Sequence, residues 1–102
     1  MEFKFKKSQD KLTIFIFGEL DEYSSSGGRE VLDRILMDNL NSKKIVFDLS
    51  GLTFMDSTGI GFLIGRYKKL KRFNVESYIS SAPLNIEKVI ELAGLYKIMP
   101  KV

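Results

Sequence analysis

Hydrophobic residues follow two different periods along the chain, and these periods predict strands and helices in a regular order. Four segments are rich in β-branched and aromatic residues or alternate between apolar and polar positions, as strands do: residues 2–7, 12–17, 43–49 and 75–79. Three other segments place apolar residues three and four apart, as helices do: residues 31–40, 60–70 and 86–93. The order strand, strand, helix, strand, helix, strand, helix predicts one α/β domain over residues 1–102.

The lengths of the connections predict how the strands pair. The short polar link at residues 8–11 predicts an antiparallel hairpin between the first two strands. The later strands are joined through helices, and such crossovers are right-handed and give parallel neighbours. We therefore expect a mixed, mostly parallel sheet of four or five strands with helices packed against it. The tail at residues 96–102 is either a further edge strand or a coil.

Periodicity also predicts the core and the ends of the helices. The expected core comprises Ile14, Ile45, Phe47, Leu63, Tyr67 and Ile90, together with Phe15 or its alternate neighbours on the second strand. Glycine costs about 0.5–1 kcal/mol in a helix interior, so Gly27 and Gly28 are expected to precede the first regular helix or to lie in its frayed first turn. Pro83 and Gly94 are suited to the start and the end of the last helix.

The candidate chemistry lies between the third strand and the second helix, at Asp56-Ser57-Thr58. Side-chain oxygens at this position can cap a helix, and one of the first two residues is expected to do so. The alternative is that the Ser57 hydroxyl, at the tip of the helix, accepts a phosphoryl group. Thr58 is the nearest rival acceptor, and the serines at 24–26 are more distant ones.

Residues around this tip complete a candidate surface for a partner. The sequence around Gly59 and Gly61 lacks the lysine of a phosphate-binding loop, which argues against a phosphate site. We expect instead that the missing side chains of these glycines let the backbone of a partner approach Ser57. Counting about 100° per residue, Phe62 points away from the apolar stripe of its helix, on the same side as Gly65. An exposed Phe62 is therefore expected to anchor a partner. Asp21 ends the second strand and is expected at the same edge of the sheet.

Composition limits the remaining possibilities. The chain has no cysteine and no histidine, which removes disulfides, the commonest metal ligands and the usual general base for a catalytic serine. No metal site, cofactor or catalytic residue is expected. The net charge of +3 raises the question of nucleic acid, but the cations at 66–72 follow one helix and are expected to lie in solvent near its carboxyl end. Without a membrane-spanning run or a signal peptide, a cytoplasmic monomer is expected.

Three stretches resemble the bacterial anti-sigma factor antagonists, which are STAS domains. They are Phe54–Lys68, Gly18-Glu-Leu-Asp21 and Leu92–Ile98, and together they span nearly the whole chain. The resemblance implies that Ser57 is phosphorylated by an anti-sigma factor serine kinase that also holds a sigma factor, and that a PPM-type serine phosphatase reverses this. It assigns partner contacts to Asp21, Asp56, Thr58, Gly59, Gly61, Phe62 and Gly65. Gly27 and Gly28 depart from the family, whose members usually carry helix-forming residues there.

Two other functions remain open from the sequence. The same fold serves as a subunit of signalling scaffolds or lipid-transport complexes, in which the serine need not be modified. A third function is an acyl or phosphoryl carrier that uses Ser57. Co-purification separates the first alternative from a kinase-binding regulator, and an acyl adduct in the native protein would indicate the second.

Overall fold

The computed structural model describes all 102 residues and confirms the predicted order of elements. The strands are β1 (Glu2–Ser8), β2 (Lys11–Leu20), β3 (Lys44–Met55) and β4 (Glu76–Ser80). The helices are α1 (Glu22–Met37), α2 (Ser57–Lys71) and α3 (Leu84–Ala93), followed by a 3-10 turn at Leu95–Lys97. None of the helices has the length and apolar character of a membrane span.

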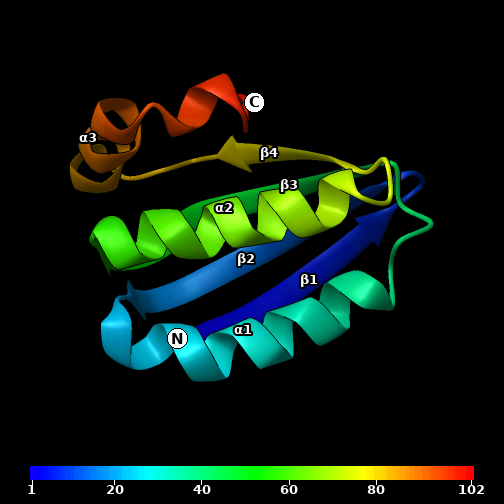
Figure 1. Ribbon diagram of the computed structural model, residues 1–102, viewed down its shortest axis with the longest axis horizontal. Helices are drawn as coiled ribbons and strands as arrows, with labels where there is room; N and C mark the ends of the chain where they lie inside the picture. The colour runs from blue at the N-terminus through cyan, green and yellow to red at the C-terminus, as the bar shows by residue number, and fades with distance from the viewer.

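The four strands form one sheet in the order β1-β2-β3-β4 (Figure 1). β1 pairs with β2 in antiparallel orientation, and β2–β3 and β3–β4 are parallel. Figure 1 shows α1 and α2 side by side in front of the sheet, with α3 next to α2 on the side of β4. The expected mixed, mostly parallel sheet with helices packed against it is therefore confirmed.

The core lies between the sheet and the helices that cover one of its faces. β2 alternates along its length, with Leu12, Ile14 and Ile16 fully buried and Phe15 half-buried on the opposite face. The expectation for Ile14 is thus confirmed, and Phe15 is outside the core. The other expected core residues are buried, except Tyr67, which packs half-exposed against them.

The first helix differs from the expectation at its start. Gly27 and Gly28 lie inside α1, which begins at Glu22, so their predicted position before the helix or in a frayed turn is wrong. A capped first turn precedes them, and the leucine stripe follows them. A Cβ on Gly28 would lie 2.1 Å from Cε of Met1. The space in front of Gly28 is therefore occupied by the flexible end of the Met1 side chain.

The carboxyl-terminal tail is fixed by one bridge and by polar contacts. Lys101 bridges to Ile79 in parallel orientation, so the tail extends the edge of β4 at a single position. Glu87 of α3 accepts hydrogen bonds from Lys101 Nζ at 2.6 Å and from Tyr96 Oη at 3.0 Å. These bonds lower the pKa of Glu87. Burial, with the bond to Glu87 adding to it, raises the pKa of Tyr96 to about 12.

Candidate functional site

Two strand–helix junctions lie next to each other at the carboxyl edge of the sheet. Leu20, the last residue of β2, pairs with Met55, the last residue of β3. Asp21 and Asp56 follow these paired residues directly and begin α1 and α2. The expectation that Asp21 lies at the same edge as the tip of α2 is therefore confirmed. Figure 1 shows α1 and α2 starting at the same end of the sheet.

Asp56 caps α2 and leaves Ser57 free. The Asp56 carboxylate accepts hydrogen bonds from the backbone N–H of Thr58 at 2.9 Å and of Gly59 at 3.2 Å. Ser57 is the first helical residue, is exposed, and its hydroxyl makes no hydrogen bond within the chain. The capping role therefore belongs to Asp56 alone. The Ser57 hydroxyl remains accessible to an enzyme that would modify it.

The serines of the first helix are held by the chain itself. Asp21 accepts hydrogen bonds from the backbone N–H of Tyr23 and Ser24, at 3.1 and 3.0 Å, and Ser24 Oγ in turn accepts one from the backbone N–H of Asp21. This reciprocal arrangement is a capping box. Ser25 is buried. Ser26 alone among these rival acceptors is exposed without such contacts, and it lies one turn into the helix.

The three glycines of α2 occupy different environments. Gly59 is buried, and a Cβ there would lie 2.3 Å from Met55 Cγ and 2.9 Å from the Leu20 carbonyl oxygen. Its missing side chain lets α2 approach the two strands, so the expectation that Gly59 leaves room for a partner is wrong. Gly61 and Gly65 face open space, as that expectation requires. Thr58, like Ser57, is exposed.

Phe62 is the main correction to the predicted surface. Its side chain is only 5% exposed and belongs to the core, so the expectation of an exposed anchor is wrong. The angular position of Phe62 on the helix agrees with the prediction, but the Ile60–Tyr67 side is not the centre of the buried face. The buried arc is instead centred on Leu63 and Leu70, and α1 covers the flank that carries Phe62.

Arg66 lies on the same covered flank and is also buried, which corrects the expectation that this cation lies in solvent. Its Nε is 2.7 Å from Oδ1 of Asp33 on α1, and its Nη1 donates to the Phe62 carbonyl at 3.3 Å. Lys69 Nζ reaches the other oxygen of Asp33 at 3.3 Å. Burial lowers the pKa of Arg66, Asp33 opposes this shift, and nearby Arg29 adds to it.

Sequence reasoning missed the hydrophobic side chains that are exposed at this edge. Tyr23, at the start of α1, is 95% exposed, and Phe54, near the end of β3, is 44% exposed. Leu84, the first residue of α3, is 71% exposed. All three elements begin or end at the carboxyl edge. A signal existed for Tyr23 and Phe54, since each aromatic lies two residues from one of the capping aspartates.

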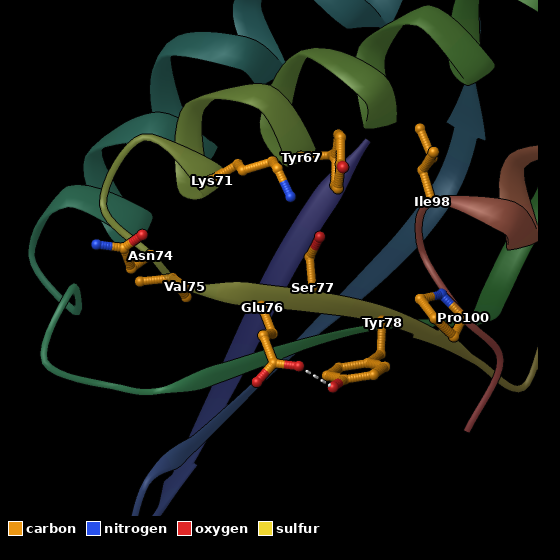
Figure 2. A pocket seen from close by; sticks show the side chains of 9 residues that line it. All are labelled: Tyr67, Lys71, Asn74, Val75, Glu76, Ser77, Tyr78, Ile98 and Pro100. Carbon is orange, nitrogen blue, oxygen red and sulfur yellow. Dashed lines mark hydrogen bonds between the residues drawn. The ribbon is translucent and has the colours of Figure 1, made fainter.

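Another cavity lies away from this edge of the sheet. It measures about 470 Å³ and is lined by Tyr67, Lys71, Asn74, Val75, Glu76, Ser77, Tyr78, Ile98 and Pro100. Figure 2 shows Ser77 pointing toward Tyr67, while Glu76 and Tyr78 point away from α2 and are hydrogen-bonded to each other. This cavity lies at the carboxyl end of α2, opposite Ser57. No cluster of three or more His, Cys, Asp or Glu side chains could hold a metal ion.

Comparison with known proteins identifies a family. The STAS domain model matches residues 2–102. An anti-sigma F factor antagonist of Paenibacillus polymyxa is 33% identical over 89 residues, which cover 87% of this chain and 75% of that protein. An anti-sigma-B factor antagonist of Staphylococcus aureus is 33% identical over 93 residues, covering 90% and 84%. The fold also matches the unphosphorylated anti-sigma factor antagonist SpoIIAA, with a TM-score of 0.78, 24% identity, and coverage of 99% and 88%.

Proposed function

The chain belongs to the STAS domain family and is related to its anti-sigma factor antagonists, and from this premise we propose that it binds an anti-sigma factor serine kinase and is released by phosphorylation of Ser57. Unphosphorylated, it would displace a sigma factor from that kinase. The antagonists of this family are regulators and not enzymes, so the kinase supplies the Mg-ATP site.

The observation that carries the proposal is the free hydroxyl of Ser57. Ser57 occupies the first position of α2, where a side-chain cap is already provided by Asp56. Its hydroxyl has no structural role in the chain that would account for a serine here. An exposed and unpaired hydroxyl at a rigid helix start is well suited to a kinase active site.

The surface around Ser57 has the mixture that protein partners use. Three exposed hydrophobic side chains, Tyr23, Phe54 and Leu84, lie at the same edge as Ser57. Aromatic side chains are enriched in protein interfaces because they bury a large area with few rotatable bonds. We assign partner contacts to these three residues and to Asp21, Asp56, Thr58, Gly61 and Gly65. Gly59 and Phe62 support this surface from below.

Phosphorylation would act at the interface. It adds about −1.5 to −2 charges and three oxygen acceptors to a surface that fits a neutral hydroxyl. The carboxylates of Asp21 and Asp56 lie at the same edge and would repel the phosphate. A desolvated charge without a partner is costly, so the kinase complex would dissociate. A separate PPM-type serine phosphatase would restore the hydroxyl, and the cycle would run in the cytoplasm on a monomer.

The test is incubation with candidate anti-sigma factor kinases and Mg-ATP, followed by mapping of the phosphorylated residue. The expected result is one phosphoryl group on Ser57, none on Ser57→Ala, and, in Thr58→Ala, a phosphoryl group that still maps to Ser57. Ser57→Ala should bind the kinase permanently and Ser57→Asp poorly. A phosphoryl group found at Ser24–Ser26, or equal kinase affinity of Ser57→Ala and Ser57→Asp, would overturn the proposal.

A further inference from the structure

A second cavity lies between α1 and α2, beside the free serine. It measures about 420 Å³ and is lined by Ser25, Arg29, Thr58, Gly61, Phe62, Gly65 and Arg66. Thr58 directly follows Ser57, so the cavity is continuous with the surface proposed to bind the kinase. A Cβ at Gly61 or Gly65 would have open space in front of it, so these two α2 positions place no side chain in the cavity.

The charges at this cavity do not balance. Two of the lining side chains are guanidinium groups and none is acidic. The neighbouring carboxylate, Asp33, already contacts both Arg66 at 2.7 Å and Lys69 at 3.3 Å. Arg29 makes no ion pair or side-chain hydrogen bond within the chain and is exposed at the rim. Arg66 and Lys69 thus share one carboxylate, and Arg29 is left without an ion-pair partner.

The Arg66 side chain is also fixed in position. It is 6% exposed, and its contacts with Asp33 and with the Phe62 carbonyl hold the guanidinium at the base of the cavity. A buried guanidinium favours a second anion because burial has removed part of its hydration. The planar donors of two arginines match the two oxygens of a carboxylate, and charge-assisted hydrogen bonds of this kind are about twice as strong as neutral ones.

We propose that this cavity receives an acidic side chain, aspartate or glutamate, of the protein that covers Ser57, with Arg29 as its ion-pair partner. The proposal rests on the proposed function, since the partner must cover Thr58 to reach the cavity. It assigns to Gly61 and Gly65 a specific role, which is to keep the space open for the incoming side chain. It also explains why an unpaired arginine faces the α2 glycines.

The first experiment measures kinase affinity in matched pairs of variants. Arg29→Gln should weaken binding by about 10-fold or more, the range of a lost hydrogen bond to a charged group. Arg34→Gln removes the same charge from an exposed position of α1 outside the cavity and should change affinity less than about twofold. Gly65→Leu should block the cavity, whereas Gly27→Leu, at another open helical glycine, should not. The free energy of unfolding of all four variants should be measured alongside.

The second experiment uses the isolated protein and separates this proposal from the proposed function. Titration with sodium glutarate, against sodium chloride at equal ionic strength, should shift the amide signals of Gly61 and Gly65 and the Nε–H signal of Arg29. The shifts should vanish in Arg29→Gln and persist in Arg34→Gln. Inorganic phosphate serves as the competing anion.

The outcomes are distinct. If a kinase phosphorylates Ser57 and binds Arg29→Gln as tightly as the wild type, the cavity proposal fails while the proposed function stands. If phosphate saturates the Arg29 signal and glutarate leaves it unchanged, the cavity is a phosphate site and the proposal fails. If no kinase binds the wild type, the proposed function fails, and the glutarate titration alone decides whether the cavity takes a carboxylate.

Discussion

The first two helices begin in the same way, but their first residues differ in hydrogen bonding and in charge. Each follows a strand directly, and each has an aspartate as N-cap. In α1, Ser24 at the third helical position completes the capping box with Asp21. In α2, the third position is Gly59, which has no side chain to return the bond, so the cap of Asp56 is one-sided.

The two tips also differ in charge at the first helical position. α1 carries Glu22 there, an anion that complements the helix dipole, whereas the first turn of α2 has no acidic residue and begins with Ser57. A phosphate on Ser57 would give α2 the negative start that α1 has permanently. At the β2–α1 junction the capping box and the negative charge are permanent. At the β3–α2 junction a negative charge can be added by phosphorylation of Ser57.

The largest predicted effect concerns Phe62, a buried side chain of α2. Phe62→Ala should lower the free energy of unfolding by about 3–5 kcal/mol, because it removes a buried aromatic ring on the flank of α2 that α1 covers. Tyr23→Ala is the control, since truncation of a side chain that is 95% exposed should change stability by less than about 0.5 kcal/mol. Urea unfolding of both variants checks this. A Phe62→Ala variant as stable as the wild type would show that burial of Phe62 against α1 does not stabilise the fold.

The error at Phe62 shows where sequence reasoning stops. Periodicity gives the angle of Phe62 relative to Ile60 and Leu63 correctly, but it gives no information on how wide the buried arc is. That width depends on whether a second helix packs against the flank. α1 does so, and it buries Phe62 and Arg66 together. The ion pair of Arg66 with Asp33 joins residues 33 positions apart, and no local pattern marks it.

Other features were predictable because they depend on local chemistry. The strand periods and the connection lengths predict the sheet and its mixed topology, and the Asp-Ser pair after a strand predicts a capped helix start at residues 56–57. Helix propensity alone misplaces Gly27 and Gly28, because it does not include the capping box that starts α1 ahead of them. Gly59 lies against Leu20 and Met55, which are brought together only when β2 and β3 pair. The local sequence therefore does not show that Gly59 is buried. The sequence alone therefore predicts an open surface at both Gly59 and Gly61, and only the packed structure shows that Gly59 is buried.

The second prediction tests whether α2 could have the cap of α1. Gly59→Ser would place the residue found in the α1 capping box at the third position of α2. We expect a loss of about 1–3 kcal/mol in the free energy of unfolding, because its Cβ would lie 2.9 Å from the Leu20 carbonyl oxygen. Gly61→Ser, in open space, should have little effect. A stabilised Gly59→Ser variant would show that the one-sided cap is not imposed by packing.

The third prediction compares the two caps directly. Asp21→Ala and Asp56→Ala should each cost about 0.5–2 kcal/mol of stability, as N-cap losses do. The Asp21 variant should lose more, because its carboxylate belongs to a reciprocal capping box, whereas the cap of Asp56 is one-sided. Asp→Asn at either position keeps the acceptor and should restore most of the loss. Thermal unfolding at pH 7 measures the order, and a larger loss at Asp56 would contradict the comparison.

The last and smallest effect is that of the phosphate itself on folding. An anion at the first position of α2 should gain about 0.3–1 kcal/mol from the helix dipole and the free N–H groups. Asp56 provides a like charge at the adjacent residue, so the two effects should nearly cancel and the unfolding free energy of the phosphorylated protein should change little. Asp56→Asn removes the repulsion and keeps the cap.

In Asp56→Asn, phosphorylation of Ser57 should therefore stabilise the protein measurably, by up to about 1 kcal/mol, as an acid does at the start of a helix. Thermal unfolding of both forms in both backgrounds gives the coupling between the phosphate and Asp56. Amide shifts should change around Ser57 and Asp21 and stay constant along β1 and β4. A local electrostatic effect would be rejected if the shift changes spread through the sheet. It would also be rejected if phosphorylation changed the stability of the wild type and of Asp56→Asn equally.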